Sequence, residues 1–198
     1  MKAYSLVTLL LFSLLLGGCA SVPVPSYKPP IANTESLLQH QGSKLDVGQV
    51  TAAGGVPNTR LSVRGSSLEG TGANHTFSAY LQDALTNELT TAGRFDHNAA
   101  TRIDATLTHN ELDGSGFSKG TADLGARFVV VRDGHSIYDK TLSVHHEWES
   151  SFMGAIAIPA TIQNYPVAVQ KLVGKLFQDG DFVKAVDGDA ARVSSGAP

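Results

Sequence analysis

The densest group of side chains that could bind a metal ion is the run His145-His146-Glu147-Trp148-Glu149. Imidazole and carboxylate groups are zinc ligands, and a metal-bound water would provide hydrolytic chemistry. A zinc site needs three or four such groups that converge on one point. In a β-strand, His145 and Glu147 would share one face while His146 and Trp148 share the other, because successive side chains alternate. We therefore predict no metal site, and keep His145 and Glu147 only as the candidates for a metal-dependent hydrolase.

A second chemical candidate is the glycine-rich run Gly70-Thr71-Gly72, which precedes a predicted helix. A strand, a glycine-rich turn and a helix N-terminus together form the phosphate-binding start of dinucleotide-binding folds. Here His75 occupies the place of the third glycine, and no βαβ crossover with a suitably placed acidic residue follows. The chain also lacks the Gly-x-Ser-x-Gly pattern of serine hydrolases. We predict no catalytic residue and no cofactor, and expect that the protein is not an enzyme.

The single cysteine, Cys19, stands at the end of a segment with the features of a signal peptide. Lys2 gives a positive start, and the run from Leu6 to Leu16 is almost wholly apolar but too short to span a bilayer. The stretch Leu16-Gly17-Gly18-Cys19 resembles the bacterial lipobox. This resemblance implies that residues 1–18 are a lipoprotein signal peptide, and that the cysteine after the cut carries acyl chains such as palmitate as a membrane anchor.

The residues after the cysteine suggest a destination and a spacer. Ala20 stands where an aspartate would retain such a lipoprotein in the inner membrane, so we expect the periplasmic face of the outer membrane. The segment 19–43 shows no periodicity and contains four prolines, at positions 23, 25, 29 and 30. Proline-rich segments prefer an extended polyproline II conformation, so the sequence predicts a tether here.

The composition favours a folded domain of mild acidity. Apolar residues make up 42% of the chain and charged residues 17%, which suits a globule rather than a disordered chain. The formal net charge of -3 argues against nucleic acid as a partner, because phosphate binding needs clustered lysine and arginine. We expect a single domain over residues 44–186, followed by a disordered tail over 187–198 that is rich in glycine, alanine and serine.

Alternating apolar and polar residues predict several β-strands. Asp133-Gly134 is the strongest hairpin turn in the chain. Strands that no helix separates pair in an antiparallel way, so the central sheet should be a meander. The predicted strands cover residues 45–48, 60–64, 103–108, 124–131 and 136–149.

Two amphipathic helices complete the prediction. In the first, over 77–92, an apolar stripe would face the core, with Thr76 as its cap and Gly93 as its stop. Polar residues lie on or toward its other side, namely Gln82, Asp83, Asn87 and Glu88. The second helix ends near Phe177, and starts either near Pro166 or, with a kink, near Pro159.

A short further turn is expected around residues 182–186. Together these elements predict an α+β fold in the order ββαβββα. About five strands form an antiparallel sheet, and the two helices pack on one of its faces.

This order of elements resembles the YajG-type family of small bacterial outer-membrane lipoproteins. The residues that carry the resemblance are the lipobox, the pattern Phe77-x-x-x-Leu81-Gln82-Asp83-x-Leu85, and the run Phe177-Gln178-Asp179 before Phe182-Val183-Lys184. The resemblance covers about residues 44–186 and implies a lipid-anchored domain. The family provides no catalytic residues that could be carried over to this chain.

An uncharged apolar segment, residues 152–160, lies between a strand and a helix, where loops are normally polar. It either packs internally, as a hairpin arm or an extension of the helix, or forms an exposed patch for a protein partner or the bilayer surface. In the second case its anchors are Phe152, Met153, Ile156 and Ile158. This chain departs from the YajG-type pattern here.

We accordingly expect a non-enzymatic lipoprotein that supports envelope assembly or transport through protein-protein contacts. The alternative is a binding module for a small or lipidic ligand held between the helices and the sheet.

Overall fold

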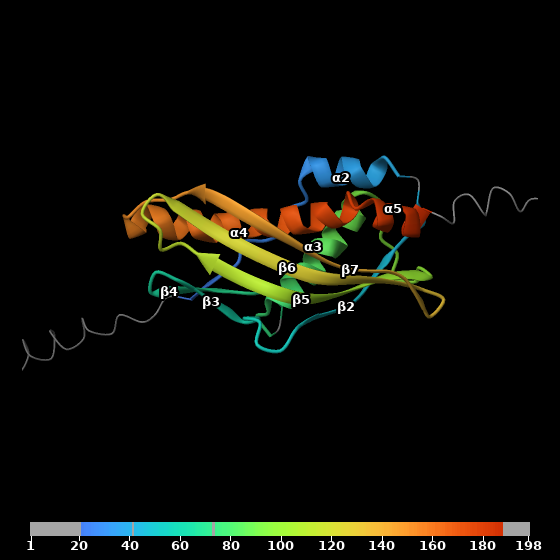
Figure 1. Ribbon diagram of the computed structural model, residues 1–198, viewed down its shortest axis with the longest axis horizontal. Coiled ribbons are helices and arrows are strands. Elements are labelled where there is room, and N and C mark those ends of the chain that lie inside the picture. Colours follow the sequence, from blue (N-terminus) through green and yellow to red (C-terminus); the bar gives the residue numbers. More distant parts are fainter. Residues whose placement is uncertain (1–20, 41, 73, 188–198) are drawn as a thin grey trace, which may run out of the picture.

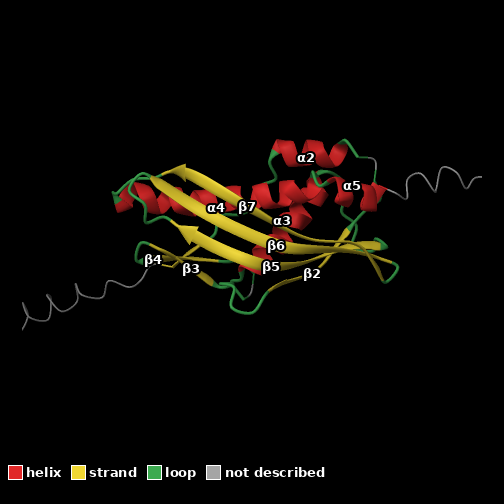
Figure 2. Ribbon diagram, in the orientation of Figure 1, coloured by secondary structure: helices red, strands yellow, loops and turns green. Residues whose placement is uncertain are grey.

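Two β-sheets and four helices make up the part of the chain that the computed structural model describes, residues 21–40, 42–72 and 74–187. The fold is α+β, as predicted. The larger sheet has the strand order β2-β5-β6-β7 (Figure 2), and the smaller sheet has the order β1-β4-β3. Cys19, the expected signal peptide and residues 188–198 of the expected tail lie outside the described residues.

The predicted meander is present in the larger sheet. β5 (Thr101–Asp113), β6 (Lys119–Arg132) and β7 (His135–Glu149) pair in an antiparallel way, and all three strands are longer than the sequence pattern predicted. Asp133 and Gly134 both adopt positive φ angles, 49° and 79°, as a tight hairpin turn between twisted strands requires.

The first predicted strand does not continue the meander. β2 (Asp46–Ala52) pairs in parallel with β5, which makes the larger sheet mixed rather than antiparallel. Between these two strands the chain makes a helical crossover through α3 (Phe77–Thr91), and such a crossover brings the chain back in the same direction.

The second predicted strand belongs to a separate small sheet. β3 (Arg60–Val63) forms a hairpin with β4 (Ser66–Glu69), and β1 (Ser21–Pro23) pairs in parallel with β4. The prediction of one sheet with about five strands was therefore wrong. The two strands that the sequence pattern missed, β1 and β4, have only three and four residues and show no apolar-polar alternation of their own.

Both predicted helices form and pack against each other. The Thr76 side chain accepts a hydrogen bond from the Ala79 backbone amide at 3.2 Å, and Gly93 has a φ of 65°, so the predicted cap and stop of α3 are confirmed. The rings of Phe77 in α3 and Tyr165 in α4 lie 5.1 Å apart, and α4 runs along β6 and β7 (Figure 1).

The second helix, α4 (Gly154–Phe177), begins earlier than either predicted start. Pro159 and Pro166 both lie within it, because burial of its apolar face outweighs the backbone hydrogen bonds that the two prolines remove. The expected short turn is a further helix, α5 (Gly180–Asp187), whose Phe182 is buried. In the described residues, no helix is long and apolar enough to cross a membrane.

The prediction of an extended tether over residues 19–43 is wrong for residues 21–40. This segment contains β1 and α2 (Ile31–Leu38), and its side chains Val24, Tyr27 and Leu37 are buried in the domain core. The prolines give the segment its extended start. The apolar side chains between them dock it onto α3 and α4, and this contact is not visible as a local pattern.

Candidate functional site

Four exposed apolar side chains gather at one end of the molecule, and we call them the apolar end cluster: Phe117, Phe152, Met153 and Ile156. Their exposed fractions are 85%, 70%, 49% and 55%. Phe117 lies in the loop between β5 and β6, and the other three lie at the start of α4 and just before it. The only other large apolar side chains that are exposed in the described residues are Ile31 and Leu38 on α2.

One arginine joins the loops that carry the cluster. Arg64 lies in the turn between β3 and β4, and its guanidinium donates hydrogen bonds to the carbonyl oxygens of Gly114 (2.5 Å), Ser115 (3.1 Å), Gly116 (2.8 Å) and Phe152 (2.8 Å). Guanidinium is suited to this role because it presents several donors in a fixed fork. Arg64 therefore links the β3–β4 turn, the β5–β6 loop and the start of α4.

The first turn of α4 fixes which of the predicted anchors face outward. The backbone amides of Ile156 and Ala157 both donate to the Met153 carbonyl oxygen at 3.0 Å, so the apolar segment is an extension of the helix. Ala157 is fully buried, and Ile158 is partly buried against the core. Three of the four predicted anchors, Phe152, Met153 and Ile156, are thus exposed, whereas Ile158 contributes to packing.

Sequence reasoning did not find Phe117. It is a lone aromatic residue in a loop of glycine and serine, so no periodicity marks it. The only signal was the contrast between an aromatic residue and its small polar neighbours. The pairing of β5 with β6 and of β6 with β7 brings this loop beside the segment after β7, where the Ser150 amide donates to the Ser118 carbonyl oxygen at 2.8 Å.

The described chain begins at the same end of the molecule. Ser21 pairs with Ser67 in β4, with their hydroxyl oxygens 3.3 Å apart, and Ser67 lies three residues after Arg64. Figure 1 shows β4, the β5–β6 loop and the first turn of α4 together at the left end. Ser21 is two residues after Cys19, so the predicted lipidation position is adjacent in sequence to this end.

The metal-ligand candidates do not converge. His145 is exposed with its Nδ1 2.7 Å from an Asp123 carboxylate oxygen, while Glu147 forms an ion pair with Lys119. Among the described residues, no group of three or more histidine, cysteine, aspartate or glutamate side chains could hold a metal ion.

On the other face of β7, His146 is buried beside Trp148, so the predicted alternation of faces is confirmed. His146 contacts Asn164 Oδ1 at 2.9 Å and the Lys171 amino group at 2.8 Å. Burial lowers the pKa of His146, and the Lys171 ammonium lowers it further. This imidazole is therefore a neutral part of the interface between β7 and α4.

The glycine-rich run before α3 is explained by close packing. A Cβ atom at Gly70 would lie 2.0 Å from the Thr76 backbone carbonyl carbon, and Gly72 has a φ of 74°. Thr71 and Thr76 exchange backbone hydrogen bonds of 3.1 and 2.9 Å, which closes the loop on the start of the helix.

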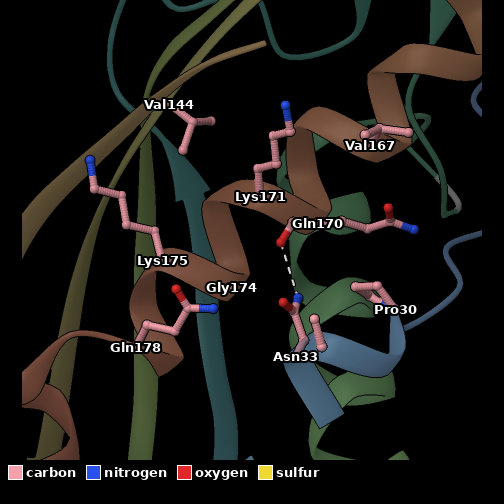
Figure 3. A pocket seen from close by; sticks show the side chains of 10 residues that line it. Pro30, Asn33, Val144, Val167, Gln170, Lys171, Gly174, Lys175 and Gln178 are labelled. Carbon is pink, nitrogen blue, oxygen red and sulfur yellow. Dashed lines mark hydrogen bonds between the residues drawn. The ribbon is translucent and has the colours of Figure 1, made fainter. Parts of the chain in front are cut away.

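A surface groove of about 420 Å³ lies between α2, α4 and β7 (Figure 3). Lys171 and Lys175 extend from α4 toward β7, where Lys175 donates to the Ser143 carbonyl oxygen at 2.8 Å. On the other side, Asn33 of α2 donates to the Gln170 carbonyl oxygen at 3.0 Å. Sequence reasoning missed this groove because it exists only where α2 docks onto α4.

The fold is similar to that of solved bacterial proteins. The crystal structure of protein XCC0632 from Xanthomonas campestris, of the family DUF330, superposes with a TM-score of 0.54 at 15% identity, over 88% of this chain and 99% of that one. A minor lipoprotein from Acinetobacter baumannii gives a TM-score of 0.37 at 11% identity, over 76% and 95% of the two chains, which is too distant to support an inference. No family model and no curated protein sequence matches this chain. The chain thus shares the fold of XCC0632, and this similarity extends over nearly the whole of that protein.

Proposed function

We propose that this protein is a non-enzymatic lipoprotein, anchored through Cys19 at the periplasmic face of the outer membrane. It acts as a structural or accessory factor in envelope assembly or transport. The observation that carries this proposal is the position of the apolar end cluster at the end of the domain where the chain arrives from Cys19. Large apolar side chains exposed together on a soluble domain mark a contact surface.

Anchoring supports such a role without any catalytic step. A domain held at a membrane meets the other components of that membrane at a raised effective concentration. Two lipid chains or more make this attachment stable, whereas a single chain gives only marginal binding. The contact with an envelope component is assigned to Phe152, Met153 and Ile156, with Ile158 beneath them as packing support.

The anchor is tested in a bacterial host by labelling with radioactive palmitate and by fractionation of the envelope. The wild-type protein should incorporate the label and sediment with the outer membrane. Cys19→Ser should lose both properties, and Ala20→Asp should move the labelled protein to the inner membrane. A wild-type protein that is unlabelled and soluble in the periplasm would overturn the proposed function.

A second candidate function is the binding of a small or lipidic ligand. The groove between α2, α4 and β7 favours it, because apolar Val144 and Val167 line this groove together with the cationic residues Lys171 and Lys175. An amphiphile with an anionic headgroup matches this lining. Titration with lysophosphatidylglycerol should raise the melting temperature of the wild-type protein, and a double substitution Lys171→Gln and Lys175→Gln should abolish that rise.

A further inference from the structure

We propose that the apolar end cluster inserts into the phospholipid surface to which Cys19 anchors the chain, so that the domain lies directly on the membrane. This inference rests on the proposed function, because it takes Cys19 as the lipidated residue. It goes further in naming the partner of the cluster as the lipid bilayer rather than a protein. It also replaces the expected long tether with direct contact.

The chain between the anchor and the domain is very short. Only Ala20 separates Cys19 from Ser21, and Ser21 is already paired with β4. A fully extended chain advances about 3.3–3.6 Å per residue, so the Cα atoms of Cys19 and Ser21 are at most about 7 Å apart. An anchor this short holds the start of β1 at the level of the lipid headgroups.

A short path through the structure joins the start of β1 to the cluster. Ser21 lies beside Ser67, which is three residues from Arg64, and Arg64 donates a hydrogen bond to the Phe152 carbonyl oxygen. With strands about 5 Å apart and about 3.3 Å per residue, this path is on the order of 20–30 Å. The cluster therefore lies within this distance of the start of β1, at the end of the domain that the anchor holds near the membrane (Figure 1).

The charged side chains around the apolar end cluster do not form a site for anionic lipid headgroups. The strand ends beside the cluster carry three acidic residues, Asp113, Glu147 and Glu149, but only one exposed lysine, Lys119. Lys119 forms an ion pair with Glu147. Arg64 is occupied by four carbonyl oxygens. The surface around the cluster is therefore not a basic patch that attracts anionic lipids. The favourable free energy of membrane binding comes instead from the insertion of aromatic and aliphatic side chains.

The experiment measures which surface of the acylated, full-length mature protein touches lipid. Acylation removes the thiol of Cys19, so a cysteine introduced elsewhere is the only free one and takes a fluorophore. Phe152→Cys and Ile156→Cys report on the cluster. Ile31→Cys is the matched control, because Ile31 is an apolar residue of α2 that is more exposed than either Phe152 or Ile156. α2 packs near Gln170, which lies fourteen residues beyond Ile156 along α4. That separation is about 21 Å of helix.

Each labelled protein is reconstituted into vesicles of phosphatidylethanolamine and phosphatidylglycerol that contain nitroxide-labelled phosphatidylcholine, and is recovered by flotation. The labels at positions 152 and 156 should be quenched, and the label at 31 should not. Equal quenching at positions 152 and 31 in floated protein would overturn the insertion and leave the proposed function intact. Failure of the protein to float would instead overturn the proposed function.

A second arm separates lipid insertion from other contacts. The unacylated Cys19→Ser protein should keep a weak, reversible affinity for vesicles of phosphatidylcholine alone at high lipid concentration, too weak to survive membrane fractionation, and this affinity should survive high salt. Phe152→Glu together with Ile156→Glu should weaken this binding by about tenfold or more, while Ile31→Glu should not. Binding that requires phosphatidylglycerol and is released by salt would overturn the inference, as would exclusive photo-crosslinking of position 152 to a protein in cells. Unchanged melting temperatures would show that both glutamate variants are folded.

Discussion

The hydroxyl of Tyr27 donates a hydrogen bond of 2.5 Å to the Oε1 atom of Glu88, and both side chains are buried. Asn33 of α2 donates to the same oxygen at 2.8 Å. Glu88 was expected on the polar side of α3. It is fully buried because the segment 21–40 covers that side, so one carboxylate fastens the N-terminal segment to the domain. Together with the pairing of β1 with β4, this attachment holds the N-terminal segment on the domain.

Removal of the Tyr27 hydroxyl should loosen that attachment. Tyr27→Phe leaves Glu88 Oε1 with one donor fewer in a buried position, and we expect a loss of about 1–3 kcal/mol in the free energy of unfolding, measured by urea denaturation. Tyr138→Phe is the matched control, because the Tyr138 hydroxyl is also buried but has no hydrogen-bond partner in the described structure. Equal losses in the two variants would contradict the role of Tyr27.

Glu88 should make stability depend on pH. Burial raises the pKa of the Glu88 carboxyl, and the hydrogen bonds from Tyr27 and Asn33 oppose this rise only in part. Below the ordinary carboxyl pKa of about 4.3 both states hold the proton. As pH rises from there to the raised pKa, the unfolded state releases its proton first, so the free energy of unfolding falls.

The measurement for Glu88 compares the wild type with Glu88→Gln in urea titrations across this pH range. The glutamine side chain keeps an oxygen for both donors and does not ionise. As pH rises through this range, the stability of the variant relative to the wild type should therefore increase by about 1.4 kcal/mol for each unit by which the pKa of Glu88 is raised. Glu35→Gln, at an exposed position of α2, is the control for replacing a carboxylate by an amide. A difference that does not vary with pH would exclude the proposed ionisation.

Gly174 should be required for the docking of α2 onto α4. A Cβ atom at this position would lie 2.4 Å from Asn33 Oδ1, and Asn33 cannot yield without losing its hydrogen bonds to Glu88 and Gln170. We expect Gly174→Ala to cost about 1–3 kcal/mol in thermal or chemical unfolding, despite the better helix propensity of alanine. Gly154→Ala, whose Cβ would meet its nearest atom at 3.8 Å, should instead be neutral or stabilise by up to about 1 kcal/mol.

Arg64 should hold the apolar end cluster in shape. Arg64→Lys keeps the charge but loses the guanidinium fork that reaches four carbonyl oxygens in two loops. Amide hydrogen exchange should therefore accelerate in residues 114–118 and 151–153, while the exchange of β6 should stay unchanged. Arg60→Lys, on the same hairpin, alters only an exposed ion pair with Glu69 and should leave these loops protected. Unaltered exchange in the Arg64 variant would mean that the loops are ordered without it.

Local patterns in the sequence predicted the elements that have their own periodicity. The stripe of α3, its Thr76 cap, the Asp133-Gly134 turn and the opposite faces of His145 and His146 all depend on neighbours within a few positions along the chain. The apolar segment 152–160 was also visible, since its composition alone sets it apart. The sequence left open whether that segment packs or is exposed. In the structure Ala157 and Ile158 pack toward the core, whereas Phe152, Met153 and Ile156 are exposed.

The tertiary structure decided every feature that depends on pairing between distant segments. It placed β2 parallel to β5, separated the small sheet from the large one and buried Glu88. Through the register of β5, β6 and β7 it also brought the loop that contains Phe117 beside the segment that follows β7. The largest difference concerns residues 21–40, whose prolines suggest a free spacer and whose few apolar side chains nevertheless dock. A sequence determines how a segment folds when the stabilising contacts are local. Where a handful of side chains gain their stability by burial against surfaces far along the chain, only the assembled core shows where they lie.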